Sequence, residues 1–146
     1  LSIGGYYETA YNLLLNKEYP SWLYPISKGA TTVWEHWDGI KEDGSLYDSQ
    51  MNSYNHYAYG SVLDWVYSVS AGISPLEPGF KKIKIEPHPD KRLGSLKATY
   101  TCPYGNISVK WEYIKGEVQY TIKVPTTAEI TINHETKIYE KGTYHF

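Results

Sequence analysis

A carboxylate stands between two tryptophans in the densest cluster of chemically capable side chains, the stretch Thr31-Thr32-Val33-Trp34-Glu35-His36-Trp37-Asp38-Gly39. Apolar rings beside a carboxylate remove water from it, which disfavours the charged form and suits the group to proton transfer. Glu35 is therefore the predicted acid/base residue. The same spacing allows another interpretation, in which the two indoles anchor a core and the neighbouring carboxylates are solvated or cap a helix.

A second cluster follows in the stretch Ser53-Tyr54-Asn55-His56-Tyr57-Ala58-Tyr59-Gly60. Apolar residues at helical spacing predict a helix over residues 53–70, with Ser53 as its N-cap and Gly72 just beyond its end. Asn55 and His56 would then lie in the first turn, where the positive end of the helix dipole disfavours a protonated imidazole. A neutral His56 could donate a hydrogen bond to a sugar hydroxyl, or it could be a packing residue.

Other chemistries have no signature in the sequence. The five histidines lack compact ligand spacing, Cys102 is the one cysteine, and there is no glycine-rich phosphate loop, so neither a metal site nor a cofactor is predicted. A net charge of −2 without a basic stripe argues against nucleic acid as a partner. The absence of an apolar run near the roughly 20 residues of a membrane span argues against a membrane.

The secondary-structure elements that must position these residues change along the chain from predicted helices to predicted strands. Besides the helix over 53–70, the apolar spacing predicts a helix over 7–16, and a short helix is a candidate over 31–37. After Pro75 the apolar period becomes two, which predicts half-buried strands in an antiparallel β-sandwich. A pair of short tail strands is expected over 137–139 and 143–146, around Lys141-Gly142. The predicted fold class is α+β, with helices in residues 1–75 and the sandwich in 76–146.

The 23 aromatic residues, mostly tyrosine and tryptophan, suit a sugar-binding surface as well as a tyrosine-rich sandwich core. Two or three helices alone bury too little surface to form a stable domain. The chain starts at Leu1, and its one methionine is Met51. We therefore expect a fragment of a longer protein, whose upstream part packs against these helices.

The string Gly-Ala-Thr-Thr-Val-Trp-Glu-His-Trp-Asp-Gly over 29–39 resembles the Thr-Thr-x-Trp-Glu-x-Trp motif of bacterial-type α-L-rhamnosidases. Ser-Tyr-Asn-His-Tyr-Ala-Tyr-Gly over 53–60 is similar to the Asn-His-Tyr-Ala-x-Gly motif of the same family, and Pro78-Gly79-Phe80-Lys81 and Pro103-Tyr104-Gly105 resemble its passage into a C-terminal β-domain. The resemblance covers nearly the whole chain. It implies the last helices of an (α/α)6 barrel followed by a β-sandwich.

The resemblance also implies roles and a reaction, the inverting hydrolysis of terminal α-L-rhamnosyl linkages in glycosides or polysaccharides. Glu35 matches the general base and His56 a rhamnose-binding histidine, while Trp34, Trp37 and Asn55 are assigned to shaping the pocket. The general acid would lie upstream of Leu1, so the 146-residue chain alone is expected to be inactive.

Three rival interpretations remain open. The sandwich could be a carbohydrate-binding module that uses exposed aromatics such as Trp111 or Tyr104, although Trp111 shares a strand face with Ile107 and Val109, which favours core packing. The chain could belong to another (α/α)6-barrel glycosidase with a different sugar. The sandwich could also be purely structural.

Overall fold

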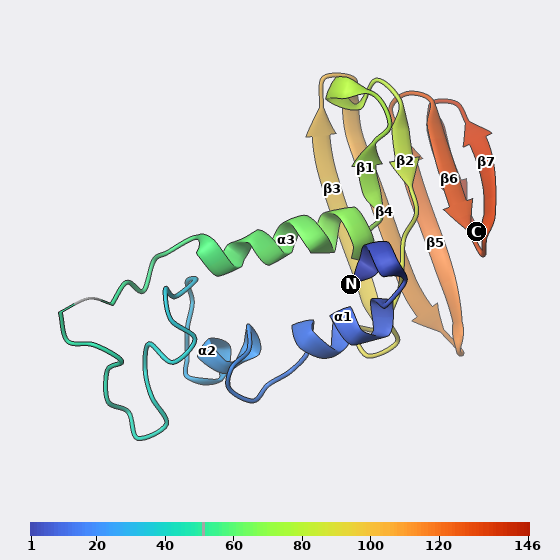
Figure 1. Ribbon diagram of the computed structural model, residues 1–146. Coiled ribbons are helices and arrows are strands. Elements are labelled where there is room, and N and C mark those ends of the chain that lie inside the picture. Colours follow the sequence, from blue (N-terminus) through green and yellow to red (C-terminus); the bar gives the residue numbers. More distant parts are fainter. Residues whose placement is uncertain (51) are drawn as a thin grey trace. The chain divides into compact units, whose positions relative to one another are not determined.

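The computed structural model describes residues 1–50 and 52–146, and the chain divides into two compact units, Leu1–Leu63 and Asp64–Phe146. Short helices and long loops make up most of the first unit, and β-strands most of the second (Figure 1). This order of elements confirms the predicted fold class. Over residues 1–50 and 52–146, no helix is both long and apolar enough to cross a membrane.

The first predicted helix is confirmed, and the candidate helix over 31–37 is wrong. Helix α1 spans Tyr7–Leu14, after the one-turn 3-10 helix η1 at Ser2–Gly4, and its Tyr11 is buried. A short helix α2 lies instead at Leu23–Ser27, where the Ser21 hydroxyl oxygen accepts a hydrogen bond from the Tyr24 N–H at 3.0 Å. Pro25 is tolerated in α2 because the first N–H groups of a helix have no intrahelical partner.

The helix predicted from Ser53 begins later than expected. Residues 58–70 form three consecutive helical segments: the 3-10 helix η2 at Ala58–Ser61, α3 at Val62–Trp65 and the π-helix η3 at Val66–Ser70. The prediction that Ser53 is the N-cap, and that Asn55 and His56 lie in the first turn, is therefore wrong. The backbone of residues 53–56 is hydrogen-bonded to residues 33–35 instead.

The end of this helical run agrees with the prediction. Gly72 lies one residue beyond the C-cap Ala71 and has a φ of 70°, in the left-handed region that glycine adopts readily. A side chain at this position would place its Cβ 2.1 Å from the Glu86 carbonyl carbon. Gly72 therefore lets the chain turn into the first strand against the backbone of Glu86.

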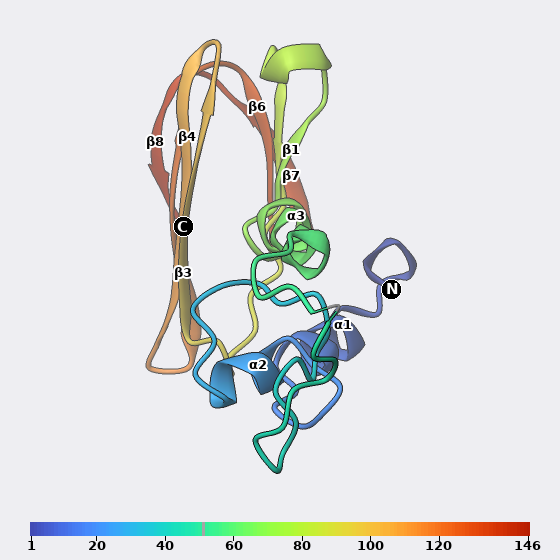
Figure 2. The ribbon, with the colours of Figure 1, turned by 90° about the vertical axis from the view of Figure 1, so that its left-hand side faces the viewer.

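The second unit contains two four-stranded sheets, with strand orders β1-β2-β6-β7 and β3-β4-β5-β8. Figure 2 shows these sheets nearly edge-on as two facing layers. The strands are β1 Ile73–Pro75, β2 Ile83–Ile85, β3 Ser95–Cys102, β4 Gly105–Ile114, β5 Glu117–Val124, β6 Ala128–Ile132, β7 Glu135–Tyr139 and β8 Gly142–His145, with the 3-10 turn η4 at Pro78–Phe80.

Two details of the predicted sandwich are corrected. Strands β2 and β6 pair in parallel, so the sheet that contains them is mixed rather than purely antiparallel. The tail strands both exist but belong to different sheets, because β7 pairs with β6 whereas β8 pairs with β5. The link between β7 and β8 therefore crosses from one layer to the other.

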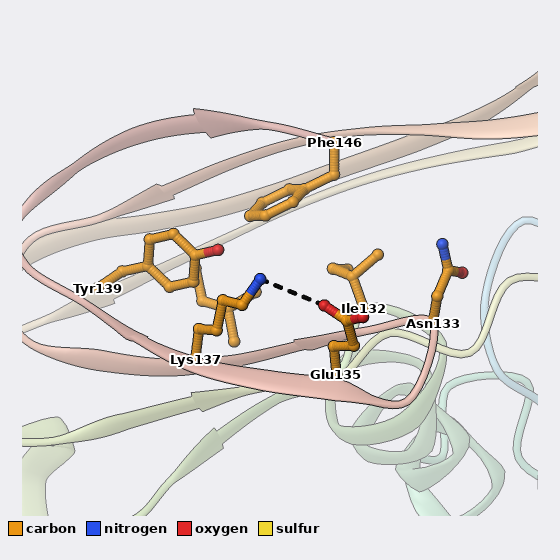
Figure 3. Close-up of a pocket in the computed structure, with 7 residues that line it drawn as sticks. Ile132, Asn133, Glu135, Lys137, Tyr139 and Phe146 are labelled. Atoms are coloured by element: carbon orange, nitrogen blue, oxygen red, sulfur yellow. Dashed lines mark hydrogen bonds and ion pairs between the residues drawn. The ribbon is translucent and has the colours of Figure 1, made fainter.

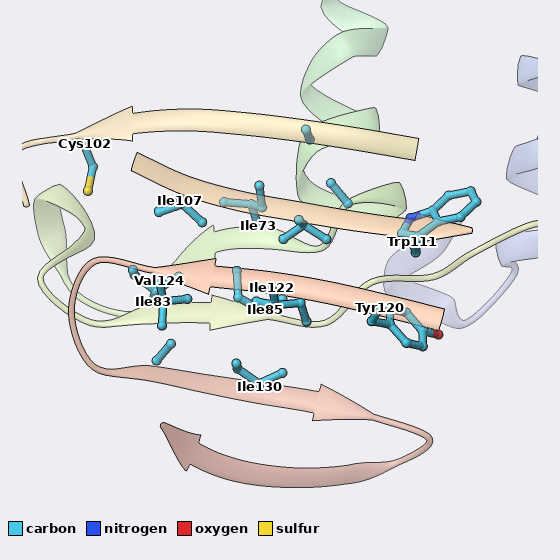
Figure 4. Packing of buried hydrophobic residues seen from close by; sticks show 14 residues of the cluster. Ile73, Ile83, Ile85, Cys102, Ile107, Trp111, Tyr120, Ile122, Val124 and Ile130 are labelled. Atoms are coloured by element: carbon cyan, nitrogen blue, oxygen red, sulfur yellow. The ribbon is translucent and has the colours of Figure 1, made fainter. Parts of the chain in front are cut away.

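The sandwich core lies between the sheets and follows the predicted alternation (Figure 4). Ile107, Val109 and Trp111 of β4 are fully buried, and the Trp111 indole N–H donates to the Ser70 carbonyl oxygen at 2.8 Å. Trp111 is thus a core residue, and it is not available as an exposed sugar platform. Tyr100 lies on the same face of β3 as the buried Ala98 and Cys102, yet it is 41% exposed on this edge strand.

Candidate functional site

The two motifs singled out from the sequence lie side by side within the first unit. The Glu35 N–H donates to the Ser53 carbonyl oxygen at 2.9 Å, and the His56 N–H donates to the Val33 carbonyl oxygen at 2.8 Å. The Thr32 hydroxyl also donates to the Tyr54 carbonyl oxygen. These long-range bonds bring the Glu35 and His56 segments together, which sequence spacing alone could not establish.

The Glu35 carboxylate is half-buried and fixed through one of its oxygens. Its Oε2 accepts a hydrogen bond from the Ser53 N–H at 3.0 Å, so the same residue pairs with both the backbone and the side chain of Glu35. Hydrogen bonds to a charged carboxylate are among the stronger ones in proteins and restrain its orientation. Among the described residues, no group donates a hydrogen bond to Oε1, which leaves that oxygen for a water molecule.

Trp34 and Trp37 pack against tyrosines from the second motif. Trp34 is 5% exposed and meets Tyr54 edge-to-face, with ring centroids 5.2 Å apart at 84°. Trp37 stacks on Tyr59 with centroids 3.7 Å apart at 15°. The indoles on either side of Glu35 are therefore anchors that hold the two segments together.

Gly39, the last residue of the first motif, lies close to the rings of Trp34 and Tyr54. A Cβ at this position would lie 3.1 Å from the Trp34 ring and 3.2 Å from the Tyr54 ring. The Gly39 carbonyl oxygen accepts hydrogen bonds from the Tyr54 hydroxyl at 2.9 Å and from the Asn52 side-chain amide at 3.0 Å. The glycine therefore allows the loop to approach the aromatic pair closely.

Trp22 belongs to the same aromatic cluster, although it is not among the residues predicted from the sequence. Its ring meets Trp37 edge-to-face at 5.2 Å, and its indole N–H donates to the Tyr59 carbonyl oxygen at 2.9 Å. An apolar pocket of about 250 Å³ opens beside these rings; its lining is Trp22, Pro25, Ile26, Thr32, Val33, Trp34, Trp37, Tyr59, Gly60, Val62 and Leu63. The tryptophan content of residues 20–40 was the signal that could have identified Trp22.

His56 and Asn55 lie just before the helical run, and not inside it. The His56 Nδ1 accepts a hydrogen bond from the Ala58 N–H at 3.3 Å, so in this geometry the proton of a neutral ring is on Nε2. Asn55 is exposed, and its N–H donates to the Ser53 hydroxyl oxygen at 3.2 Å. The His56 ring thus presents an N–H donor at Nε2, for a reason different from the predicted helix dipole.

Asp38, the second carboxylate of the first motif, lines another pocket. This cavity of about 390 Å³ lies within the first unit, and its lining is Glu18, Tyr19, Tyr24, Asp38, Lys41 and Glu42. Carboxylates outnumber the single lysine in it, so its local charge is negative. Over residues 1–50 and 52–146, no cluster of three or more His, Cys, Asp or Glu side chains could hold a metal ion.

Comparison with known families accounts for both units. Residues 1–69 match the bacterial alpha-L-rhamnosidase 6 hairpin glycosidase domain, and residues 72–145 match the bacterial alpha-L-rhamnosidase C-terminal domain. An alpha-L-rhamnosidase of Streptomyces avermitilis is 42% identical over 145 residues, which are 96% of this chain and 14% of that protein. One of Formosa agariphila is 45% identical over 131 residues, 88% of this chain and 14% of that protein.

Solved structures give the same result. The α-L-rhamnosidase of Aspergillus terreus superposes with a TM-score of 0.93 at 36% identity, over 100% of this chain and 18% of that one. The Streptomyces avermitilis enzyme, solved in complex with L-rhamnose, superposes with a TM-score of 0.87 at 37% identity, over 99% of this chain and 16% of that one. The chain spans about 14% of the length of the curated relatives it matches. It belongs to the bacterial α-L-rhamnosidase family, in which it corresponds to the end of the six-hairpin glycosidase domain and the C-terminal domain.

Proposed function

We propose that this chain forms part of an enzyme that removes terminal α-L-rhamnose from glycosides or polysaccharides by inverting hydrolysis, with Glu35 as the general base. The observation that carries the proposal is the Glu35 carboxylate, which Ser53 holds through Oε2 beside the His56 segment. Oε1 accepts no hydrogen bond from the described residues and can accept a proton from water. The membership of the chain in a family of α-L-rhamnosidases supports the substrate class.

The reaction requires two carboxyl groups with opposite tasks. A protonated carboxylic acid gives its proton to the glycosidic oxygen, while a carboxylate takes a proton from the attacking water on the opposite face of the sugar. The two groups lie about 6.5–9.5 Å apart in inverting enzymes, which leaves room for that water. Glu35 fills the second role. The acid comes from a part of the glycosidase domain that residues 1–63 do not include.

The polar neighbours of Glu35 have tasks that follow from their geometry. Because Nδ1 of His56 accepts the Ala58 N–H, Nε2–H can donate to a rhamnose hydroxyl. Asn55 is exposed and its amide can both donate to and accept from hydroxyl groups. His56 and Asn55 would bind hydroxyl groups of the sugar while Glu35 accepts the proton of the attacking water.

Trp34 and Trp37 form part of the wall of the apolar pocket in the first unit and give that pocket its shape. Both line the apolar cavity in the first unit, and each packs on a tyrosine from the second motif. The same cavity exposes apolar side chains that the rest of the glycosidase domain would cover. We therefore propose that residues 1–63 pack against the remainder of their own domain in the intact protein. The expected boundary between residues 1–75 and residues 76–146 stays a prediction, which limited proteolysis of the intact protein would test.

The direct test is the stereochemistry of hydrolysis by the intact protein that carries these residues. Hydrolysis of p-nitrophenyl α-L-rhamnoside, followed by proton NMR, should first release β-L-rhamnose, which then mutarotates. Initial release of the α-anomer would contradict inversion, and no release would contradict the proposed substrate. The isolated chain of 146 residues should release no rhamnose, because it lacks the general acid.

A further inference from the structure

A mixed polar and aromatic pocket lies entirely within the β-sandwich unit. It has a volume of about 290 Å³ and is built by strands β6 and β7, the turn between them and the residue after β8 (Figure 3). This volume is just below the roughly 300–1,000 Å³ of ordinary small-molecule sites. The pocket is therefore large enough for one small ligand.

Alternation along the two strands places its lining on one face. Glu135, Lys137 and Tyr139 are two residues apart on β7, so their side chains point to the same side of the sheet. Across the hairpin, Ile132 is the partner of Glu135 and Ile130 is the partner of Lys137. The register thus combines an apolar floor from β6 with a polar rim from β7.

Two rings form the wall of the pocket. The rings of Tyr139 and Phe146 have centroids 5.7 Å apart and planes at 87°, so they form a right-angled corner. Phe146 is held by backbone hydrogen bonds with Tyr120 in both directions, at 2.9 and 3.2 Å, and its side chain is still 39% exposed. A fixed, accessible aromatic corner offers flat apolar surface to the C–H face of a sugar ring.

The polar side chains around this corner determine which class of ligand the pocket can bind. The Lys137 ammonium lies 3.2 Å from the Glu135 carboxylate, so the charges of the pair cancel. Asn133, in the left-handed turn with a φ of 51°, adds an amide that both donates and accepts. Donors and acceptors without net charge match a ligand rich in hydroxyl groups, because each hydroxyl can both donate and accept.

We propose that this pocket is a second carbohydrate site, which binds a neutral pyranose sugar on the β-sandwich. Its ligand class rests on the proposed carbohydrate-acting function, whereas its residues are separate from Glu35 and from the first unit. Charged side chains at inward positions of the edge strand β7 also prevent unwanted strand pairing. Edge protection alone requires neither the aromatic corner nor any sugar binding, so the two roles make different predictions.

The test reports on the pocket itself. In the intact protein, 3-fluorotyrosine replaces Tyr139, and its ¹⁹F resonance is followed during titration with L-rhamnose, D-galactose and D-glucose in turn. At least one sugar should give a saturable shift, with a dissociation constant around the millimolar range expected of so small a ligand. The same label at Tyr104, an exposed residue of the β3–β4 turn, should not respond.

Matched variants identify the groups that bind. Lys137→Met keeps the length of the side chain but removes its donors, and Asn133→Gly keeps the left-handed turn but removes the amide. Each should weaken binding at least threefold, while Lys123→Met, on an exposed position of β5, should leave it unchanged. Unchanged circular dichroism and an unchanged urea midpoint would show that the variants remain folded.

Three results would overturn the proposal: no saturable shift with any of the three sugars, tighter binding of the anion D-glucuronate, or full binding in both variants. The Glu35→Gln protein should bind as the wild type does. Failure of the hydrolysis proposal would appear as turnover that does not depend on Glu35, which leaves the ¹⁹F result unaffected.

Discussion

Trp111 connects the sandwich core to the end of the helical run, and its substitution measures that connection. Trp111→Phe removes the indole N–H that donates to the Ser70 carbonyl oxygen at 2.8 Å, in a side chain that is 0% exposed. Loss of a buried hydrogen bond costs about 0.5–1.5 kcal/mol. The two missing carbons add about 1.6 kcal/mol of lost burial at ~0.8 kcal/mol each, and the residual cavity adds more. The expected loss is about 2–4 kcal/mol of unfolding free energy.

Urea unfolding of the 146-residue chain, followed by circular dichroism of the strands, gives the measurement. The loss should also lower the thermal midpoint by roughly 8–32 °C, since about 4–8 °C accompany each kcal/mol in a domain of 60–100 residues. Tyr104→Phe is the matched control, because Tyr104 is 48% exposed and its change should stay within about 0.5 kcal/mol. Equal, small shifts for both variants would refute the account of Trp111 as a core residue.

Three further predictions concern the sandwich unit. Gly72→Ala should destabilise it by at least about 2 kcal/mol, since the new Cβ would lie 2.1 Å from the Glu86 carbonyl carbon at a φ of 70°; a wild-type urea midpoint would contradict this. Burial lowers the pKa of His88 below its ordinary 6.5, so the unfolded chain binds more protons than the folded chain at acidic pH. The contribution of His88 to the free energy of unfolding should therefore be constant above pH 6.5 and fall as the pH drops below it. The variant His88→Asn should flatten this slope. The hydrogen bond from Arg92 lowers the pKa of Asp90 below its ordinary 3.8, so its stabilisation is present above pH 3.8 and is lost as the pH falls further; Arg92→Met should remove this loss from urea midpoints measured between pH 4 and 2.

Local sequence pattern predicted which side chains of a single strand are buried. The alternation in residues 105–114 placed Ile107, Val109 and Trp111 on a buried face because a strand with one packed side has a period of two. The same reasoning could not find the parallel pairing of β2 with β6, since each strand is short and the partners are more than 40 residues apart. Such a register is fixed by long-range packing and not by either segment alone.

The start of the helical run at Ala58 is also fixed by a long-range contact that the local sequence does not reveal. Ser53 is a good N-cap by residue type, yet its N–H and C=O are both hydrogen-bonded to Glu35. The propensity of residues 53–57 for a helical turn is overridden by pairing with a segment about 20 residues earlier. The sequence therefore identified Glu35 and His56 as candidates, whereas only the folded chain shows that their segments are neighbours and that Trp22 and Tyr59 support them.

The measurement that bears most directly on the proposed function is the turnover of p-nitrophenyl α-L-rhamnoside by the intact protein with Glu35→Gln. Glutamine keeps the size of the side chain but cannot accept the proton of the attacking water, so kcat should fall by about 10²–10⁴-fold. Glu42→Gln, on an exposed carboxylate of the same unit, is the control and should keep wild-type turnover. A Glu35→Gln protein that is folded and retains near-wild-type kcat would contradict the assignment of Glu35 as the general base.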